Sequence, residues 1–427
     1  MEEPVTLDNC ANEPIHVPGA IQPHGVLLAV DTTRLRTTFV SANATSLFGV
    51  EPREILGGNV RDLFDRKHAD TISRLVDKRS LRELNPLQLE TRSGALVETV
   101  AHHSNEHLVL EMEATSKSLN SSFDPRMRQA IVRLQGATSV AALTTIAAEE
   151  VRSLTGFDRV MVYRFDPAWN GQVVAEAKRE SLEPFLGLHY PASDIPEQAR
   201  RLYTLNWLRH IVDIGYTPVP LLSLEASPTQ LDLSHAHLRS VSPIHVEYLT
   251  NMGVRASMSI SLVADGQLIG LIACHHYSGP KLLDYTLRET CEYLGQALSW
   301  NLRVLEHSDG AERSRMIREA EAEVATSLAG AEDLLDGLAN PALAAIADAF
   351  FEHHGGAGRT EDRGARRLAA RARGRRLRDG PPLRALRAGK AVGQRRGRPP
   401  RRDGLPGARR VPPLVPPLHR ADRGLGR

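Results

Sequence analysis

The chain has 427 residues, of which 41% are hydrophobic, and a formal net charge of +2. This length predicts two to four domains, and this share of hydrophobic residues is enough for ordinary globular cores. The net charge averages two different regions. Residues 357–427 contain about 21 arginines and one lysine against about five acids, so this tail is near +17 and the rest of the chain is near −15.

Three widely spaced cysteines exclude a disulfide framework and a zinc ribbon, and they suit a reducing cytosol. No stretch approaches the roughly 18 apolar residues of a membrane span, and the acidic N-terminus lacks the basic and apolar regions of a signal peptide. We therefore expect a soluble, cytoplasmic protein. Cys274, His275 and His276 are adjacent on an expected strand, where neighbours point to opposite faces, so we expect no metal site there.

Residues 15–112 indicate a small α+β domain. Strands are expected at residues 25–30 and 107–112, and residues 38–43 lead from a strand into a capped helix at 44–48. The segment ahead of this domain, residues 1–12, is polar and contains Cys10. A polar linker at 117–123 follows the domain.

The next region mixes helices and strands in the manner of a second α+β domain. Residues 125–155 repeat an apolar face and predict a helix, and strands are expected at 160–165 and 171–177. Two further strands are expected at 256–263 and 268–275, around an Asp-Gly turn. In the first of these, serines alternate with apolar residues, so one face is hydroxylic and the other apolar. Residues 282 to about 348 read as mostly helix, either a connector that leaves the domain or a two-helix hairpin packed on it.

The stretch 191–196, PASDIP, is the most distinctive part of the chain. Its two prolines fix their own φ and keep the preceding residues out of the helical region, so Asp194 is expected on a stiff loop. From Glu197 the pattern is helical and carries Tyr203 and Arg209 close to the base of that loop. A carboxylate, a phenol and a guanidinium suit a large planar ligand with N–H donors and carboxylates, although a proline-rich turn before an amphipathic helix explains the loop alone equally well.

Four separated stretches, in one order, resemble phytochromes, in particular the bacterial type that uses biliverdin. They are DNCANEPIHVPGAIQPHG at 8–25, TGFDRVMVYRF at 155–165, PASDIP with its following helix, and the serine- and histidine-bearing segment at 238–276. The resemblance implies an N-terminal attachment segment at 1–14, a PAS domain at 15–115, a chromophore-binding GAF domain at 125–305, and a connector helix with the start of a PHY domain at 306–355.

The fold class that follows is α+β, with two antiparallel sheets flanked by helices. In this family the segment ahead of the PAS domain passes under a loop of the GAF domain and forms a knot, and Ile15, Pro18 and Ile21 are the apolar residues expected to fill the crossing.

The resemblance also implies a site for a linear tetrapyrrole, biliverdin IXα. The thiolate of Cys10 adds to a vinyl group of ring A, the main-chain carbonyl of Asp194 accepts from the pyrrole N–H groups, and His245 holds a water over them. His275 binds the ring D carbonyl. The other positions flank ring D, line the pocket or grip the propionates, and they are Met161, Tyr163, Ile195, Pro196, Tyr203, Arg209, Arg239, Ser242, Tyr248, Ser257 and Ser259.

The resemblance ends in the tail, residues 356–427. This Arg-, Pro- and Gly-rich segment cannot bury enough apolar surface to offset its ordering entropy, and we expect it to be disordered. A nucleic-acid-binding tail is one interpretation, but there is no aromatic interleaving or RGG repeat. We favour a reading-frame shift that truncates the PHY domain, because residues 413–417, read one base over, resemble a stretch of PHY domains.

The implied function is a red/far-red photoreceptor that switches by isomerisation of the bilin C15=C16 bond and signals along the connector helix. Family members usually carry a histidine kinase. We expect no enzyme activity here, a homodimer through the GAF and connector helices, a separate histidine kinase or response regulator, and photoconversion that is incomplete without the PHY domain. A membrane partner is not expected. The alternative is a GAF module that binds a cyclic nucleotide without photochemistry.

Overall fold

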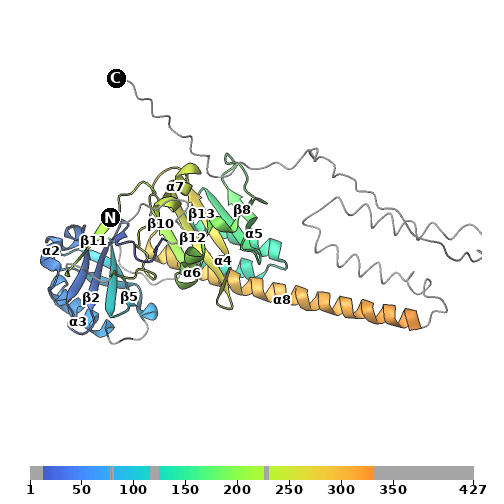
Figure 1. The fold of residues 1–427 in the computed structure, drawn as a ribbon, viewed down its shortest axis with the longest axis horizontal. Helices are drawn as coiled ribbons and strands as arrows, with labels where there is room; N and C mark the ends of the chain where they lie inside the picture. The colour runs from blue at the N-terminus through green and yellow to red at the C-terminus, as the bar shows by residue number, and fades with distance from the viewer. Residues whose placement is uncertain (1–12, 77, 79–80, 116–124, 226–229, 330–427) are drawn as a thin grey trace, which may run out of the picture. The chain divides into compact units, whose positions relative to one another are not determined.

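The computed structural model describes residues 13–76, 78, 81–115, 125–225 and 230–329. Cys10, the linker at 117–123 and the basic tail lie outside these residues. The chain divides into one unit up to Leu305 and a second that begins at Glu306, of which only residues 306–329 are described. Two antiparallel sheets organise the first unit (Figure 1).

The first sheet is the core of the PAS-like domain. It has the order β1-β11-β3-β2-β6-β5-β4. Its strands are β1 (Ala20–Ile21), β2 (Val26–Asp31), β3 (Thr37–Ser41), β4 (Leu87–Glu90), β5 (Leu96–Ser104), β6 (His107–Ala114) and β11 (Val219–Ser223), with helices α1 (Thr45–Phe48), α2 (Pro52–Ile55) and α3 (Arg66–Leu75) beside them. The strands expected near residues 25–30 and 107–112 are confirmed. The expected cap of α1 is wrong, because the Asn43 amide donates instead to the carbonyl of Gly25 at 2.9 Å.

The segment before β2 is held on both sides by the second domain, through residues 219–221 and 238–240. On one side β1 pairs with β11; on the other, the amide of Gln22 donates to the Leu238 carbonyl at 2.7 Å, and the amide of Ser240 donates to the Ala20 carbonyl at 3.0 Å. This is the crossing that the resemblance implies. Ile21 fills it, being fully buried, but Pro18 is exposed and Ile15 only half-buried, so the expectation was right for Ile21 and wrong for Pro18.

The second sheet belongs to the GAF-like domain and has the order β10-β12-β13-β7-β8-β9. Its strands are β7 (Arg159–Phe165), β8 (Gly171–Lys178), β9 (His189–Tyr190), β10 (Leu208–Ile211), β12 (Ala256–Ala264) and β13 (Gln267–His276). The helices of this region are α4 (Pro125–Gln135), α5 (Val140–Thr155), α6 (Glu197–Leu205), α7 (Pro243–Asn251) and α8 (Tyr285–Ala329). One face of the sheet forms a single apolar core with α4, α5 and the first turns of α8 (Figure 1).

Three sequence expectations need correction. The helix expected at 125–155 is two helices, since the chain breaks at 136–139 and the Ser139 hydroxyl caps α5 by accepting from the amide of Ala142 at 3.2 Å. The helix after Glu197 ends at Leu205, so Arg209 lies on β10 instead. The long helix expected from residue 282 begins at Tyr285 instead and is described to Ala329, and the rest of its expected length lies outside the described residues. Among the described residues, no helix combines the length and apolar character that crossing a bilayer requires.

Candidate functional site

Six of the fifteen expected site residues lie on the face of the GAF sheet away from the apolar core. Strand pairing places Arg209 opposite Ser259, and Ala273 between Ser259 and Met161. Directly opposed residues project from the same side of a sheet. The adjacent row runs from Ser257 to His275. The alternation expected in β12 is confirmed, because Met258, Ile260 and Leu262 all enter the apolar core on the other side.

Asp194 was expected on a stiff loop rather than in a helix or a central strand, and it lies at the end of a single 3₁₀ turn, η4 (Ala192–Asp194). Pro191 precedes this turn, and Pro196 is the N-cap of α6. Burial raises the pKa of Asp194, and its Oδ2 atom has no hydrogen-bond partner among the described residues. The turn therefore presents a partly desolvated carboxylate.

Three phenols surround this carboxylate. Burial raises the pKa values of Tyr163, Tyr190 and Tyr248, and the nearby charge of Asp194 raises each of them further. The rings of Tyr163 and Tyr190 lie 5.6 Å apart between centroids. These phenols stay protonated at neutral pH and are available as hydrogen-bond donors. Tyr190 was missed by sequence reasoning, although it directly precedes the PASDIP stretch.

Two histidines approach the site, the half-buried His245 from α7 and the buried His275 from β13. The ring of His245 stacks on Tyr248 with centroids 6.1 Å apart. Burial, together with the smaller effect of the Arg209 charge, lowers the pKa of His245 to about 4. Burial also lowers the pKa of His275 to about 3, with smaller contributions from Arg159 and His245. Both imidazoles are neutral at pH 7, and the Nδ1 atom of His275 has no partner in the described part of the chain.

The two expected anion-binding arginines have different surroundings. Arg209 donates to four carbonyl groups of the segment 236–240, and those of Ala236, His237 and Ser240 lie at 3.3–3.4 Å. Arg239 donates from Nη1 to the carbonyl of Ile15 at 2.5 Å, while its Nε atom has no partner within the described residues. Burial lowers the pKa of Arg239 to about 9, so this side chain is still mostly charged at pH 7. Arg209 thus holds a loop, and Arg239 keeps a donor available.

The remaining expected residues are placed less distinctively. Met161 is buried, and the carbonyl of Tyr203 accepts from the Ser261 hydroxyl at 2.6 Å. The Ser242 hydroxyl donates to Glu13 at 2.5 Å, and the carbonyl of Ile195 accepts from Arg200 at 2.8 Å. Cys10 lies outside the described residues. In the described part of the chain, no group of three or more His, Cys, Asp or Glu side chains is placed to hold a metal ion.

The atoms left without partners suit a bilin. Asp194 offers a buried acceptor, Arg239 a buried donor with positive charge, and His275 a ring nitrogen that is a donor or an acceptor by tautomer. A linear tetrapyrrole has N–H groups, a terminal carbonyl and two carboxylates, and so needs each of these kinds of partner. The residues present fit the group that the sequence implied.

Comparisons with known proteins agree with this fit. Residues 10–115 match the PAS fold family, and residues 139–300 match the GAF domain family. The chain is 42% identical to cyanobacterial phytochrome B of Nostoc sp., over 78% of this chain and 45% of that protein. It is also 42% identical to a bacteriophytochrome of Pseudomonas aeruginosa, over 79% of this chain and 46% of the relative.

A solved structure decides the family. The wild-type chromophore-binding domain of a Stigmatella aurantiaca phytochrome is 45% identical, with a TM-score of 0.66, and the match covers 68% of this chain and 98% of that one. The chain belongs to the bacteriophytochromes. The photosensory core module of an S. aurantiaca phytochrome matches with a TM-score of 0.72 and 41% identity, over 82% of this chain and 70% of that one. The PAS and GAF fold that the resemblance implied is confirmed for this bacteriophytochrome, which spans a little under half the length of the curated relatives it matches.

Proposed function

We propose that this bacteriophytochrome is the light-sensing part of a red/far-red photoreceptor, with biliverdin IXα bound covalently at Cys10. The observation that carries the proposal is the cluster of neutral imidazoles, protonated phenols and the Asp194 turn on one sheet face, with unpartnered atoms on Asp194 and His275. When bound, the bilin supplies red-light absorption and isomerisation of its C15=C16 bond. The relatives reported above are phytochromes, which does not favour the cyclic-nucleotide alternative.

The residues of the chain would divide the ligand among them. The Asp194 carbonyl and His245 would serve the central N–H groups, and His275 and the phenols of Tyr163 and Tyr203 would surround the terminal ring. Arg239 would bind a propionate, helped by the hydroxyls of Ser242, Ser257 and Ser259. Arg209 would act from one layer further out, since its Nη atoms are engaged with carbonyl groups. Ile195, Pro196, Met161 and Tyr248 would complete the walls.

The domain boundaries are part of the proposal: attachment segment 1–14, PAS 15–115, GAF 125–305, connector and start of PHY 306–355, and basic tail 356–427. The tail as an out-of-frame remnant of a PHY domain also remains a proposal. Sequencing the gene tests it, because a shifted frame without PHY-like sequence would contradict it. We further propose a cytoplasmic location and no enzymatic activity of the chain itself.

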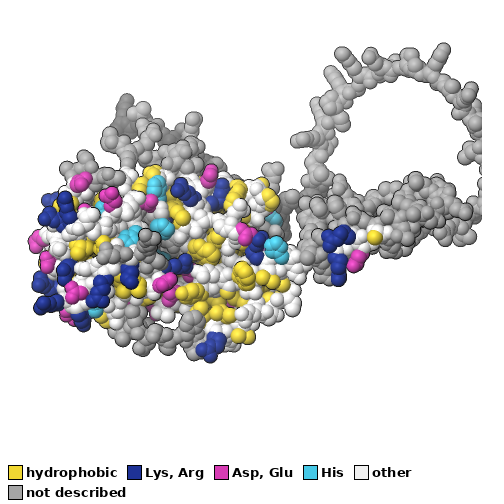
Figure 2. All heavy atoms as spheres, turned by 90° about the horizontal axis from the view of Figure 1, so that it is seen from below, with side chains coloured by type: hydrophobic (Ala, Val, Ile, Leu, Met, Phe, Trp, Pro, Cys, Tyr) yellow, Lys and Arg dark blue, Asp and Glu magenta, His cyan; other side chains and the backbone are white. Residues whose placement is uncertain are grey.

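We also propose a homodimer through the GAF helices and the connector, which signals to a separate histidine kinase or response regulator. Large apolar side chains are exposed on one stripe of α8, with Tyr293 44%, Trp300 73% and Val304 50% exposed. Their spacing of seven and four residues keeps them on one helix face. Figure 2 shows charges of both signs interspersed at the PAS end of the view, whereas hydrophobic side chains are more frequent toward the GAF end. Analytical ultracentrifugation of Trp300→Glu tests this interface, because the added charge should dissociate the dimer.

The function is tested by producing the chain together with a haem oxygenase. The denatured protein should show zinc-induced fluorescence on its gel band, and Cys10→Ser should abolish it. The Asp194→Ala variant should retain the band but lose photoconversion, because the carboxylate is removed without touching the attachment site. Absence of both the band and red absorbance before denaturation would contradict the proposal.

A further inference from the structure

Beside the proposed bilin contacts lies a buried ion pair, Arg159 with Glu176. The two side chains are only 2% and 3% exposed. An ion pair this deeply buried is costly to desolvate and is weak evidence for stability, so the contacts of the two side chains point to another role. Arg159 lies on β7 and Glu176 on β8, outside the set of residues that the resemblance assigned.

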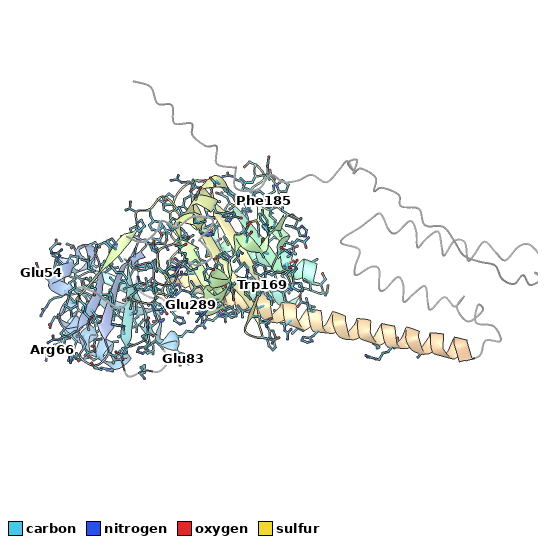
Figure 3. The ribbon with its side chains drawn as sticks, in the orientation of Figure 1. Glu54, Arg66, Glu83, Trp169, Phe185 and Glu289 are labelled. Atoms are coloured by element: carbon cyan, nitrogen blue, oxygen red, sulfur yellow. The ribbon has the colours of Figure 1, made fainter. Side chains whose placement is uncertain are left out.

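Two of the remaining polar atoms of the pair, Oε2 of Glu176 and Nη2 of Arg159, reach toward one segment of the chain. The Oε2 atom of Glu176 accepts from the amides of Phe185 and Leu186 at 2.9 and 3.2 Å. Arg159 donates to the Glu183 carbonyl at 2.7 Å, and its guanidinium lies 3.6 Å from the centroid of the Phe185 ring. Phe185 is labelled in Figure 3. The pair therefore holds residues 183–186 by hydrogen bonds to their backbone and by the contact of the guanidinium with the Phe185 ring.

The clamped segment leads directly to the Asp194 turn. After Leu186 the chain stays bound to β8, since the Gly187 amide donates to the Val173 carbonyl at 2.9 Å and β9 pairs with the start of β8. Tyr190 and Pro191 then enter η4. We call residues 183–194 the strap. It is held at its start, residues 183–186, and in its middle, at β9, so the position of Asp194 at its end depends on how Phe185 is held.

The same arginine also faces the other side of the proposed ring D environment. Arg159 is directly opposite His275 in the pairing of β7 with β13, and its Nε donates to the Tyr277 hydroxyl at 3.1 Å. The ring of Tyr277 in turn lies edge-on to His275, with centroids 6.4 Å apart. One buried pair thus contacts both the strap that ends in Asp194 and the surroundings of His275.

We infer that Arg159 and Glu176 are positioning residues that set the place of Asp194 relative to His275, with Phe185 as the link. This rests on the proposed bilin function for its consequence in light sensing, but not for its structural content. It goes beyond the binding residues, because neither charged group is needed to touch the chromophore. The pair instead determines whether the groups that do touch it are held in one arrangement.

The test uses the full-length chain and the variant Glu176→Gln. An amide has one acceptor oxygen, so it cannot serve both Arg159 and the amides of Phe185 and Leu186. Hydrogen exchange of the amides of Asp194 and Ile195, far along the strap from the substituted atoms, should become faster by about tenfold without ligand. In the biliverdin-loaded protein, covalent attachment should persist while the yield of photoproduct falls.

The matched control is Glu113→Gln. Glu113 is also a carboxylate held by a buried arginine, Arg288, at 2.5 and 3.0 Å, and its own side chain is 17% exposed; it lies on β6 and, among the described residues, contacts nothing in the strap. The Glu113→Gln variant should lower the free energy of unfolding and leave hydrogen exchange of the Asp194 and Ile195 amides unchanged. Equal acceleration in both variants, or none in Glu176→Gln, would overturn the inference.

Phe185→Leu covers the case in which Glu176→Gln does not fold. It keeps the ion pair and apolar bulk but removes the ring under the guanidinium, so exchange at Asp194 should rise about threefold, and unchanged exchange would overturn the inference. The proposed function fails separately, if the wild-type chain takes up no biliverdin. The exchange measurements on the ligand-free chain would still decide the role of the pair.

Discussion

The two faces of the GAF sheet differ in what holds them. One face, with Met258, Ile260 and Leu262, is fully buried against α4, α5 and α8 and contains no polar side chain of the site. The other, with Ser257, Ser259 and His275, buries polar groups, of which His275 keeps an unpartnered nitrogen. Apolar burial stabilises the fold, whereas unpaired polar burial lowers stability and prepares a site. Side chains that alternate along one strand therefore serve different purposes: those on one face stabilise the fold, and those on the other face are available to bind a ligand.

The largest expected effect comes from breaking the apolar face. Ile260→Ala should lower the free energy of unfolding by about 2–5 kcal/mol, because it leaves a cavity under α8. A Cβ on Gly295 of that helix would come within 2.5 Å of Ile260, so the contact is already close. Urea unfolding followed by circular dichroism measures the change.

The matched variant is its neighbour on the other face, Ser259→Ala, which should change the free energy of unfolding by no more than about 0.5 kcal/mol. An equal decrease in the free energy of unfolding for Ile260→Ala and Ser259→Ala would show that the two faces contribute equally to stability and would contradict this contrast.

Acid should destabilise the protein through the site face. The pKa values of His245 and His275 are lowered to about 4 and about 3, from 6.5 when unfolded. Between these values the unfolded state binds protons that the folded state does not. Their contribution is therefore complete above pH 6.5 and is lost as the pH falls toward 4, by about 1–3 kcal/mol for each group.

This is measured by unfolding the wild type and His275→Gln at several pH values between 7 and 4.5, where the variant should show the shallower slope. Glu111 on β6 acts in the opposite sense. Its pKa is raised to about 7 by burial, so its contribution is present below pH 4.5 and is lost as the pH rises through 7. An identical slope in wild type and His275→Gln would contradict the assignment to the site face.

Local sequence patterns predicted the main strands of the GAF sheet but not the segments that connect them. The alternation in β12 follows from the pleat, and this strand shows it by itself. The apolar spacing after Glu197 continued through Trp207 and Leu208 and suggested a longer helix, yet Asn206 adopts an extended conformation and the chain enters β10. Strand β11 was not predictable, because it joins the sheet of the other domain, and no local pattern encodes such a distant partner.

The site divides in the same way. The two prolines marked Asp194, and the family resemblance named most of the residues that gather around it. Arg159 and Glu176 were missed because their role depends on contacts with Phe185, which strand pairing alone does not reveal. The available signal was the period of two: Arg159, Met161 and Tyr163 share one side of β7, where two of the three were already assigned.

Crowding the site face should have a smaller effect than opening the core. A Cβ added at Gly171 would overlap the ring of Tyr163, so Gly171→Ala must move this phenol. Such overpacking costs about 1–3 kcal/mol, and near-ultraviolet circular dichroism should show the altered tyrosine environment. Gly136→Ala is the control, because its Cβ would meet only ordinary contacts at 3.6 Å. An unchanged tyrosine signal in Gly171→Ala would contradict the expected displacement.

The smallest expected effect lies at the rim of the site, where Arg200 stacks on Trp169. The guanidinium is 4.6 Å from the indole centroid, and its Nη1 donates to the carbonyl of Ile195 at 2.8 Å, just after the Asp194 turn. Trp169 is 37% exposed, so Arg200→Lys should lower the free energy of unfolding by only about 0.5–1 kcal/mol.

The informative readout is fluorescence. The chain has three tryptophans, so Trp207→Phe and Trp300→Phe leave Trp169 as the single emitter. In this background Arg200→Lys should shift the emission to the red, as water replaces the planar cation, whereas Arg201→Lys, on an exposed position of the same helix, should not. A red shift with Arg201→Lys but not with Arg200→Lys would show that Arg200 is not the arginine that stacks on Trp169. A shift with Arg200→Lys at nearly unchanged stability would show that the site face has contacts that position residues without holding the fold together.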